Sequence, residues 1–171
     1  MTKPYPCSWS GVFPAATTQF DQSMQVDLTA TQRVQKALLD DGVHGLVLMG
    51  TVGEGNSLNA DEKRRVLQAA VEVSGGSPVI VGVSEFTTAT AASFARDAER
   101  LGASGLMVLP AMVYVPTAAE LEYHFKTVAA ASGLPIMLYN NPPSYRVNID
   151  IATLARLADV PNIGANPRQT P

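Results

Sequence analysis

Residues 44–58, HGLVLMGTVGEGNSL, join a short apolar run to a glycine-rich turn. The run is nearly continuous in apolar residues rather than alternating, which is typical of a strand that is covered on both faces in a parallel sheet. Directly after the turn, Asn59 and Glu62 stand three residues apart, in the pattern of a capping box at the start of a helix. This stretch therefore predicts a strand–turn–helix unit.

The same unit recurs along the chain at intervals of roughly thirty residues, the usual size of a βα unit. Further strands are predicted within Val12–Phe20 (strand and following loop), Pro78–Val83, Gly105–Pro110 and Pro135–Asn141. Amphipathic helices are predicted at Ala30–Asp41, Asn59–Ser74, Thr88–Leu101, Thr117–Ala131 and Ile149–Leu157. Asn162–Ala165 has the pattern of the start of a sixth strand.

Serial strand–helix units belong either to a doubly wound sheet or to a (β/α)8 barrel. The first unit has no GxGxxG turn, which weakens the dinucleotide-binding version of the doubly wound fold. A complete barrel typically needs about 250 residues, and the chain has 171.

Composition excludes several classes of function. The net charge is −3, without a basic stripe, so we expect no nucleic-acid partner. Cys7 is the only cysteine, which excludes a disulfide framework and fits a cytoplasmic protein. We expect no signal peptide behind Lys3 and no membrane span. His44 and His124 lack the spacing of a metal motif, so we expect structural roles for them and no metal or organic cofactor.

Three strand ends carry the candidate chemistry, because function in both folds lies at the carboxyl ends of strands. In GTVGEGNSL (residues 50–58), glycines around Thr51 and Val52 would let backbone N–H groups converge on a small anion such as a carboxylate. In LYNNPP (138–143), Tyr139 would move a proton if neighbouring hydroxyls share it. In LPAMVYVP (109–116), Tyr114 is a weaker candidate. A plain glycine turn, a core tyrosine and a packed loop aromatic are the structural alternatives.

Together with GVFPAATTQF (11–20), these stretches resemble the dihydrodipicolinate synthase / N-acetylneuraminate lyase family from about Trp9 to Ile163. The resemblance implies an α/β fold, an incomplete TIM (β/α)8 barrel with about five βα units and the start of strand six. It also implies a lyase or aldolase that acts on pyruvate or a related 2-oxo acid through a lysine Schiff base. Full-length relatives are expected to be homo-oligomers, commonly tetramers.

Carried onto this sequence, the resemblance assigns Thr51 and Tyr139 to catalysis. It assigns Thr51, Val52, Gly53 and, more weakly, Tyr114 to substrate binding. Val52 replaces the second threonine of the family's Gly-Thr-Thr-Gly-Glu motif, but its backbone N–H is kept.

Two positions depart from the lysine-biosynthesis members of the family. Those members carry an arginine five residues after the strand-five tyrosine, where it grips a dicarboxylate. Here Ser144 stands at that position, and Arg146 is displaced by two residues. The departure favours sugar-acid or hydroxyproline-type catabolism over lysine biosynthesis.

The end of the chain departs further. Relatives place the Schiff-base lysine soon after the Asn-Ile start of strand six, but residues 164–171, GANPRQTP, contain no lysine. The other lysines are expected on the surface: Lys3, Lys36, Lys63 and Lys126. We therefore expect an amino-terminal tail (1–10), a partial barrel (11–165) and an aberrant tail (166–171), as in a truncated or frame-shifted product. Such a chain would expose the apolar inner face of the barrel. The alternative to an enzyme is a non-enzymatic barrel fragment, inert or self-associating.

Overall fold

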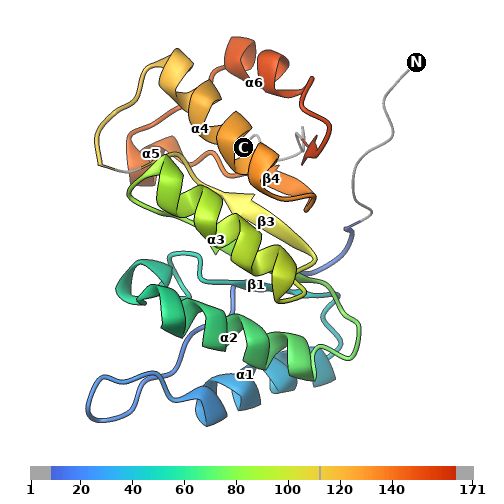
Figure 1. Ribbon diagram of the computed structural model, residues 1–171. Helices are drawn as coiled ribbons and strands as arrows, with labels where there is room; N and C mark the ends of the chain where they lie inside the picture. The colour runs from blue at the N-terminus through green and yellow to red at the C-terminus, as the bar shows by residue number, and fades with distance from the viewer. Residues whose placement is uncertain (1–8, 112, 165–171) are drawn as a thin grey trace.

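The computed structural model describes residues 9–111 and 113–164 (Figure 1). In this part of the chain one sheet has its strands in chain order, and every neighbouring pair is parallel. The strands are β1 (Leu46–Leu48), β2 (Val79–Val83), β3 (Gly105–Val108), β4 (Ile136–Leu138) and β5 (Ile163–Gly164). A doubly wound sheet reverses its order at a switch point, so this sequential order favours the barrel arrangement.

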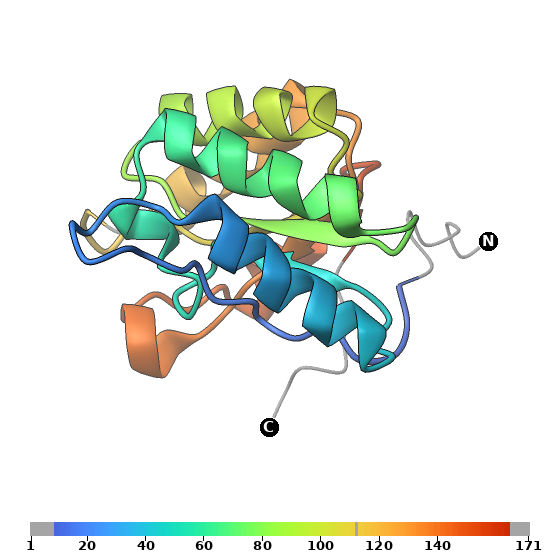
Figure 2. The ribbon, with the colours of Figure 1, turned by 90° about the horizontal axis from the view of Figure 1, so that it is seen from below.

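Helices alternate with the strands, as predicted. The five longest are α1 (Leu28–Asp40), α2 (Ala60–Val73), α3 (Thr88–Arg100), α4 (Ala118–Ala131) and α6 (Ile151–Leu157). They lie side by side in chain order in Figure 1. The short helices η1 (Gly55–Ser57) and α5 (Pro142–Tyr145) follow β1 and β4. Figure 2 shows α5 on the opposite side of the sheet from α2 and α3. No helix in the described ranges is long and apolar enough to cross a membrane.

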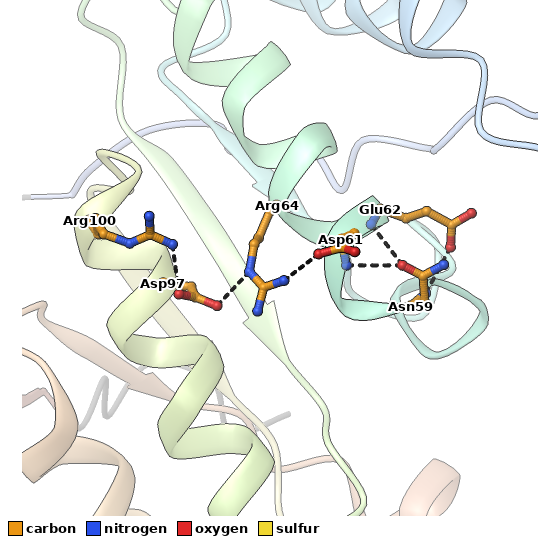
Figure 3. Close-up of polar contacts among 6 residues, drawn as sticks. All are labelled: Asn59, Asp61, Glu62, Arg64, Asp97 and Arg100. Carbon is orange, nitrogen blue, oxygen red and sulfur yellow. Dashed lines mark hydrogen bonds and ion pairs between the residues drawn. The ribbon is translucent and has the colours of Figure 1, made fainter.

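The predicted capping box at the start of α2 is confirmed (Figure 3). The Asn59 side-chain oxygen accepts hydrogen bonds from the backbone N–H groups of Asp61 and Glu62, at 2.9 and 3.0 Å. The Glu62 carboxylate accepts one from the Asn59 N–H at 2.8 Å. These reciprocal bonds fix the residue at which the helix begins and thereby the length of the glycine-rich turn before it.

A chain of ion pairs joins α2 to α3 (Figure 3). Arg64 donates from Nε to Asp97 at 2.7 Å and from Nη1 to Asp61 at 2.6 Å, and Arg100 donates to Asp97 at 2.9 Å. Burial opposes ionisation of Asp97, but the hydrogen bonds from Arg64 and Arg100 outweigh it and lower the pKa of the carboxyl group. The two helices are thus held side by side on the outer face of the sheet.

The main core lies between this outer face and the helices, around the fully buried Leu67 and Phe125. A second, smaller cluster covers the inner face of the sheet: Val47, Ile80, Met107 and Leu109. These four residues are at most 9% exposed, so the expectation that the inner face is exposed is wrong for the described residues. The physical reason is aromatic cover. Half-buried rings pack against the cluster from outside the sheet: Trp9, Phe13, Tyr139 and Tyr145.

The first predicted strand forms only partly. Ala15 makes a single parallel bridge to Val47 of β1, with the Ala16 N–H donating to Val47 and the Val47 N–H donating to Pro14, both at 2.9 Å. Pro14 has no N–H to continue the ladder. This segment nevertheless lies beside β1, where the first strand of a barrel would lie.

His124 of α4 is buried beyond the end of β3, at 3% exposure. Its Nε2 lies 3.0 Å from the Leu109 carbonyl, which can only accept, so Nε2 carries the proton of the neutral ring and donates it. Nδ1 then accepts from the Thr88 hydroxyl at 3.0 Å. Burial lowers the pKa of His124, although the bond to Leu109 acts in the opposite direction.

We therefore predict an acid-sensitive stability. The unfolded chain binds a proton at His124 near pH 6.5, whereas the folded chain does so only at lower pH, so the unfolded state binds more protons in between. The stability that the neutral His124 side chain contributes is complete above about pH 6.5. It is lost as the pH falls toward the lowered pKa of the folded state. Guanidinium denaturation at pH 7.5 and 5.5 measures the difference between the free energies of unfolding at the two pH values. His124→Gln should abolish most of the difference, and an unchanged difference would contradict the assignment.

Candidate functional site

The turn after β1 folds tightly back on the end of its own strand. Met49 is buried and has a left-handed backbone, with φ 55°, which is unusual for a residue other than glycine. A Cβ at Gly53 would lie 2.7 Å from the Met49 nitrogen and 2.8 Å from the Ala16 oxygen, and one at Gly55 would lie 2.2 Å from the Met49 oxygen. Only glycine fits at these two positions without a backbone shift.

Two side-chain hydrogen bonds fix the turn from outside. The Thr18 hydroxyl donates to the Gly53 carbonyl at 2.8 Å. Ser84, just beyond β2, donates from its hydroxyl to the Asn56 side-chain oxygen at 2.8 Å. The turn is therefore anchored both to the amino-terminal segment and to the neighbouring strand end.

The turn leaves donors without acceptors. Glu54 donates its N–H to the Thr51 carbonyl at 3.2 Å, and Gly55 donates to the Gly50 carbonyl at 3.3 Å. Within the described part of the chain, the backbone N–H groups of Thr51–Gly53 donate to no acceptor. Successive free N–H groups in a turn suit an anion such as a carboxylate.

The turn borders a cavity of 540 Å³ on the inner face of the sheet. Its floor is the inner-face cluster described above, and its rim includes Gly50, Thr51, Val52, Tyr139 and Tyr145. Thus Thr51, Val52 and Tyr139, three of the residues predicted from sequence, line one cavity, and Gly53 adjoins it through the turn. A cavity of this size exceeds what a three-carbon acid fills.

Two tyrosines from the region after β4, Tyr139 and Tyr145, line the same cavity as Thr51. The Thr51 hydroxyl is hydrogen-bonded to the Tyr145 hydroxyl, 94 residues away in sequence. Tyr139 packs edge-on against the Tyr145 ring, with centroids 6.1 Å apart, and its own hydroxyl accepts from the Asn141 side-chain amide at 3.3 Å. Sequence reasoning paired Thr51 with Tyr139 and missed Tyr145.

Tyr114 is not brought to this cavity. It is 59% exposed in the segment between β3 and α4, and its hydroxyl donates to the Glu120 carboxylate at 2.9 Å. This hydrogen bond raises the pKa of Tyr114. The structure therefore gives Tyr114 a contact with the capping residue of α4 and none with Thr51.

None of the described residues that line the cavity is a lysine. Lys36 and Lys126 lie on helices as exposed partners of Asp40 and Glu122, as predicted. The expectation that Lys63 lies on the surface is wrong. Its side chain is buried between α2 and α3, where it pairs with Glu85 and lies 5.6 Å from the centre of the Phe94 ring. The position expected for the family lysine falls in residues 165–171, outside the described residues.

Fold and site together define a class: a chain of (β/α) barrel units with a glycine-rich turn, whose N–H groups lack acceptors among the described residues, at the carboxyl end of a strand. The sequence matches the dihydrodipicolinate synthetase family over residues 8–166, and the chain belongs to that family.

Solved structures and curated sequences agree with this assignment. The 4-hydroxy-tetrahydrodipicolinate synthase of Desulforamulus reducens is 39% identical over 156 residues, which are 90% of this chain and 53% of the relative. The dihydrodipicolinate synthase structure from Aquifex aeolicus is 32% identical, with a TM-score of 0.89 over 95% of this chain and 56% of that chain. The structure of the Acinetobacter baumannii enzyme, which contains pyruvate, is 28% identical, with a TM-score of 0.85 over 92% of this chain and 55% of that chain. The chain thus spans about half the length of these relatives, and the expectation of an incomplete TIM barrel is confirmed.

Proposed function

We propose that this chain forms the 2-oxo-acid-binding part of a Schiff-base lyase or aldolase, with pyruvate or a related 2-oxo acid as its ligand. The observation that carries the proposal is the turn at Thr51–Gly53. Thr51 and Val52 line a cavity that also has phenols on its rim, and the backbone N–H groups of Thr51–Gly53 donate to no acceptor within the described residues. Family membership and the pyruvate in the Acinetobacter baumannii structure support the choice of ligand.

In the proposed complex the backbone N–H groups of Thr51, Val52 and Gly53 bind the carboxylate. Backbone donors suffice for this, so the valine at position 52 does not prevent binding. The Thr51 hydroxyl donates a hydrogen bond to the oxygen of the ketone. Tyr139, which also lines the cavity, supplies the phenol that moves a proton during bond making or breaking.

Carbon–carbon or carbon–oxygen chemistry through an imine needs an amine beside the ketone. The cavity presents no lysine from the described residues. We therefore propose that the 171-residue chain alone binds a 2-oxo acid reversibly without forming the imine. A non-enzymatic barrel fragment, inert or self-associating, is the second candidate, and the same missing amine favours it.

We further propose that the ligand is not the dicarboxylate of lysine biosynthesis. Ser144 has no charge with which to bind a second carboxylate, and Arg146 is exposed at the end of α5 with a left-handed backbone, φ 58°. The Desulforamulus reducens relative and the Aquifex aeolicus structure described above carry the lysine-pathway enzyme name, so similarity to them does not favour the sugar-acid or hydroxyproline branch. Sugar-acid or hydroxyproline-derived 2-oxo acids remain the proposed substrate class.

Two measurements on the same sample test the proposal. Equilibrium dialysis with isotope-labelled pyruvate should show saturable binding, which Thr51→Val weakens by about five- to tenfold because one hydrogen bond is lost. Borohydride reduction in the presence of pyruvate should leave the mass of the chain unchanged, whereas a relative that carries the family lysine gains a stable adduct. Failure to retain pyruvate would leave the inert fragment as the better account. An adduct on this chain would show that one of its own amines reaches the ketone.

A further inference from the structure

We infer that Tyr145 is a positioning residue for the Thr51 hydroxyl in the 2-oxo-acid site. The inference rests on the proposed function and adds a residue to it. Thr51 follows β1, and Tyr145 is the last residue of α5, yet their hydroxyls are hydrogen-bonded across the cavity rim. The one contact thus connects the anion-binding turn to the segment that follows β4.

The phenol of Tyr145 is held in place from its own side. Asn141 ends the stretch after β4, and its carbonyl accepts from the Tyr145 N–H at 3.0 Å. Pro142 occupies the first position of α5, where its fixed φ suits a helix start and its missing N–H costs nothing. The ring then packs edge-on against Tyr139. Backbone and ring contacts together restrict where the hydroxyl can lie.

Hydrogen-bond capacity explains why the pairing matters. A threonine hydroxyl has one proton and two lone pairs, and a phenol can likewise donate one bond and accept others. When the Tyr145 hydroxyl takes up one of these hydrogen-bonding positions on the Thr51 hydroxyl, the remaining donor or acceptor positions of Thr51 are directed toward the cavity. Tyr139 does not do this in the structure: its hydroxyl accepts from the Asn141 side-chain amide and, among the described residues, is not hydrogen-bonded to Thr51. Tyr145 thus acts on the ligand through Thr51.

A double-mutant cycle in pyruvate affinity tests the inference. We expect Tyr145→Phe to weaken binding by about three- to tenfold and Thr51→Val by about five- to tenfold, each through one lost hydrogen bond. The double variant should be no weaker than Thr51→Val alone, because Tyr145 has nothing left to position. Tyr139→Phe is the matched control. The factor by which it reduces affinity should be the same in the parent chain and in the Thr51→Val variant. Circular dichroism confirms that each variant is folded.

The outcomes separate the inference from the proposed function. Losses that multiply in the double variant would assign Tyr145 a general packing role and overturn the inference, and so would a Tyr145→Phe variant that binds as tightly as the parent. If the unsubstituted chain binds no pyruvate, the proposed function itself fails, and the positioning role fails with it.

Discussion

Lys63→Met should lower the free energy of unfolding by about 3 kcal/mol, a large effect for a single lysine. The ammonium group is paired with Glu85 in the segment between β2 and α3, and both side chains are largely buried, at 9% and 16% exposure. Methionine matches the aliphatic stem and fills the same space against Phe94. It therefore removes the charge alone and leaves the Glu85 carboxylate in a poorly solvated position. Urea denaturation measures the loss.

Two controls isolate the ion pair. The double variant Lys63→Met/Glu85→Leu should recover most of the lost stability, because replacing both partners with apolar groups removes the unpaired charge. Lys36→Met removes the cation from an exposed pair with Asp40, whose side chains are 60% and 62% exposed, and should change stability little. Equal effects at Lys63 and Lys36 would show that the buried pair is not a structural contact.

Gly53→Ala should abolish measurable pyruvate binding, a loss of more than tenfold, and lower stability by about 1–3 kcal/mol. The added Cβ would lie 2.7 Å from the Met49 nitrogen and 2.8 Å from the Ala16 oxygen, which are both backbone atoms. The turn must therefore move, and the N–H groups of Thr51–Gly53 move with it. Dialysis with labelled pyruvate measures binding, and denaturation measures stability.

Val52→Thr is the matched control, one residue away. Val52 is 55% exposed, and the substitution keeps the backbone while it restores the threonine that relatives usually carry. It should leave the affinity for pyruvate within about twofold of the parent. The free energy of unfolding should stay within about a few tenths of a kcal/mol of the parent value. If Val52→Thr changes binding as much as Gly53→Ala, side chains rather than backbone donors hold the ligand.

Local patterns in the sequence were sufficient for much of the fold. The capping box at Asn59 and Glu62 involves residues three positions apart, so it could be read directly and is confirmed. Helix α1 begins at Leu28, two residues before the predicted start at Ala30, because Asp27 caps it by accepting from the Ala30 N–H. The Asp-Leu-Thr-Ala sequence carries that signal.

Contacts between distant segments could not be read in this way. Lys63 lies in a polar part of its helical pattern, and nothing nearby in sequence indicates that Glu85 will cover it. Tyr145 follows two prolines, which indicate a loop, and its partner Thr51 is 94 residues away. The aromatic cover of the inner face likewise depends on Trp9, which sequence reasoning placed in a tail. Spatial neighbours of this kind are set by tertiary packing rather than by local propensity.

A pyruvate titration followed through the backbone amides by isotope-edited NMR tests the central claim most directly, because that claim concerns three particular N–H groups. The account predicts that the amide signals of Thr51, Val52 and Gly53 shift together and saturate, and that they move downfield as donors do when they gain a carboxylate acceptor. Glu54 and Gly55, whose N–H groups already have carbonyl partners, should shift less. Saturable shifts that centre elsewhere, or none at this turn, would contradict the account.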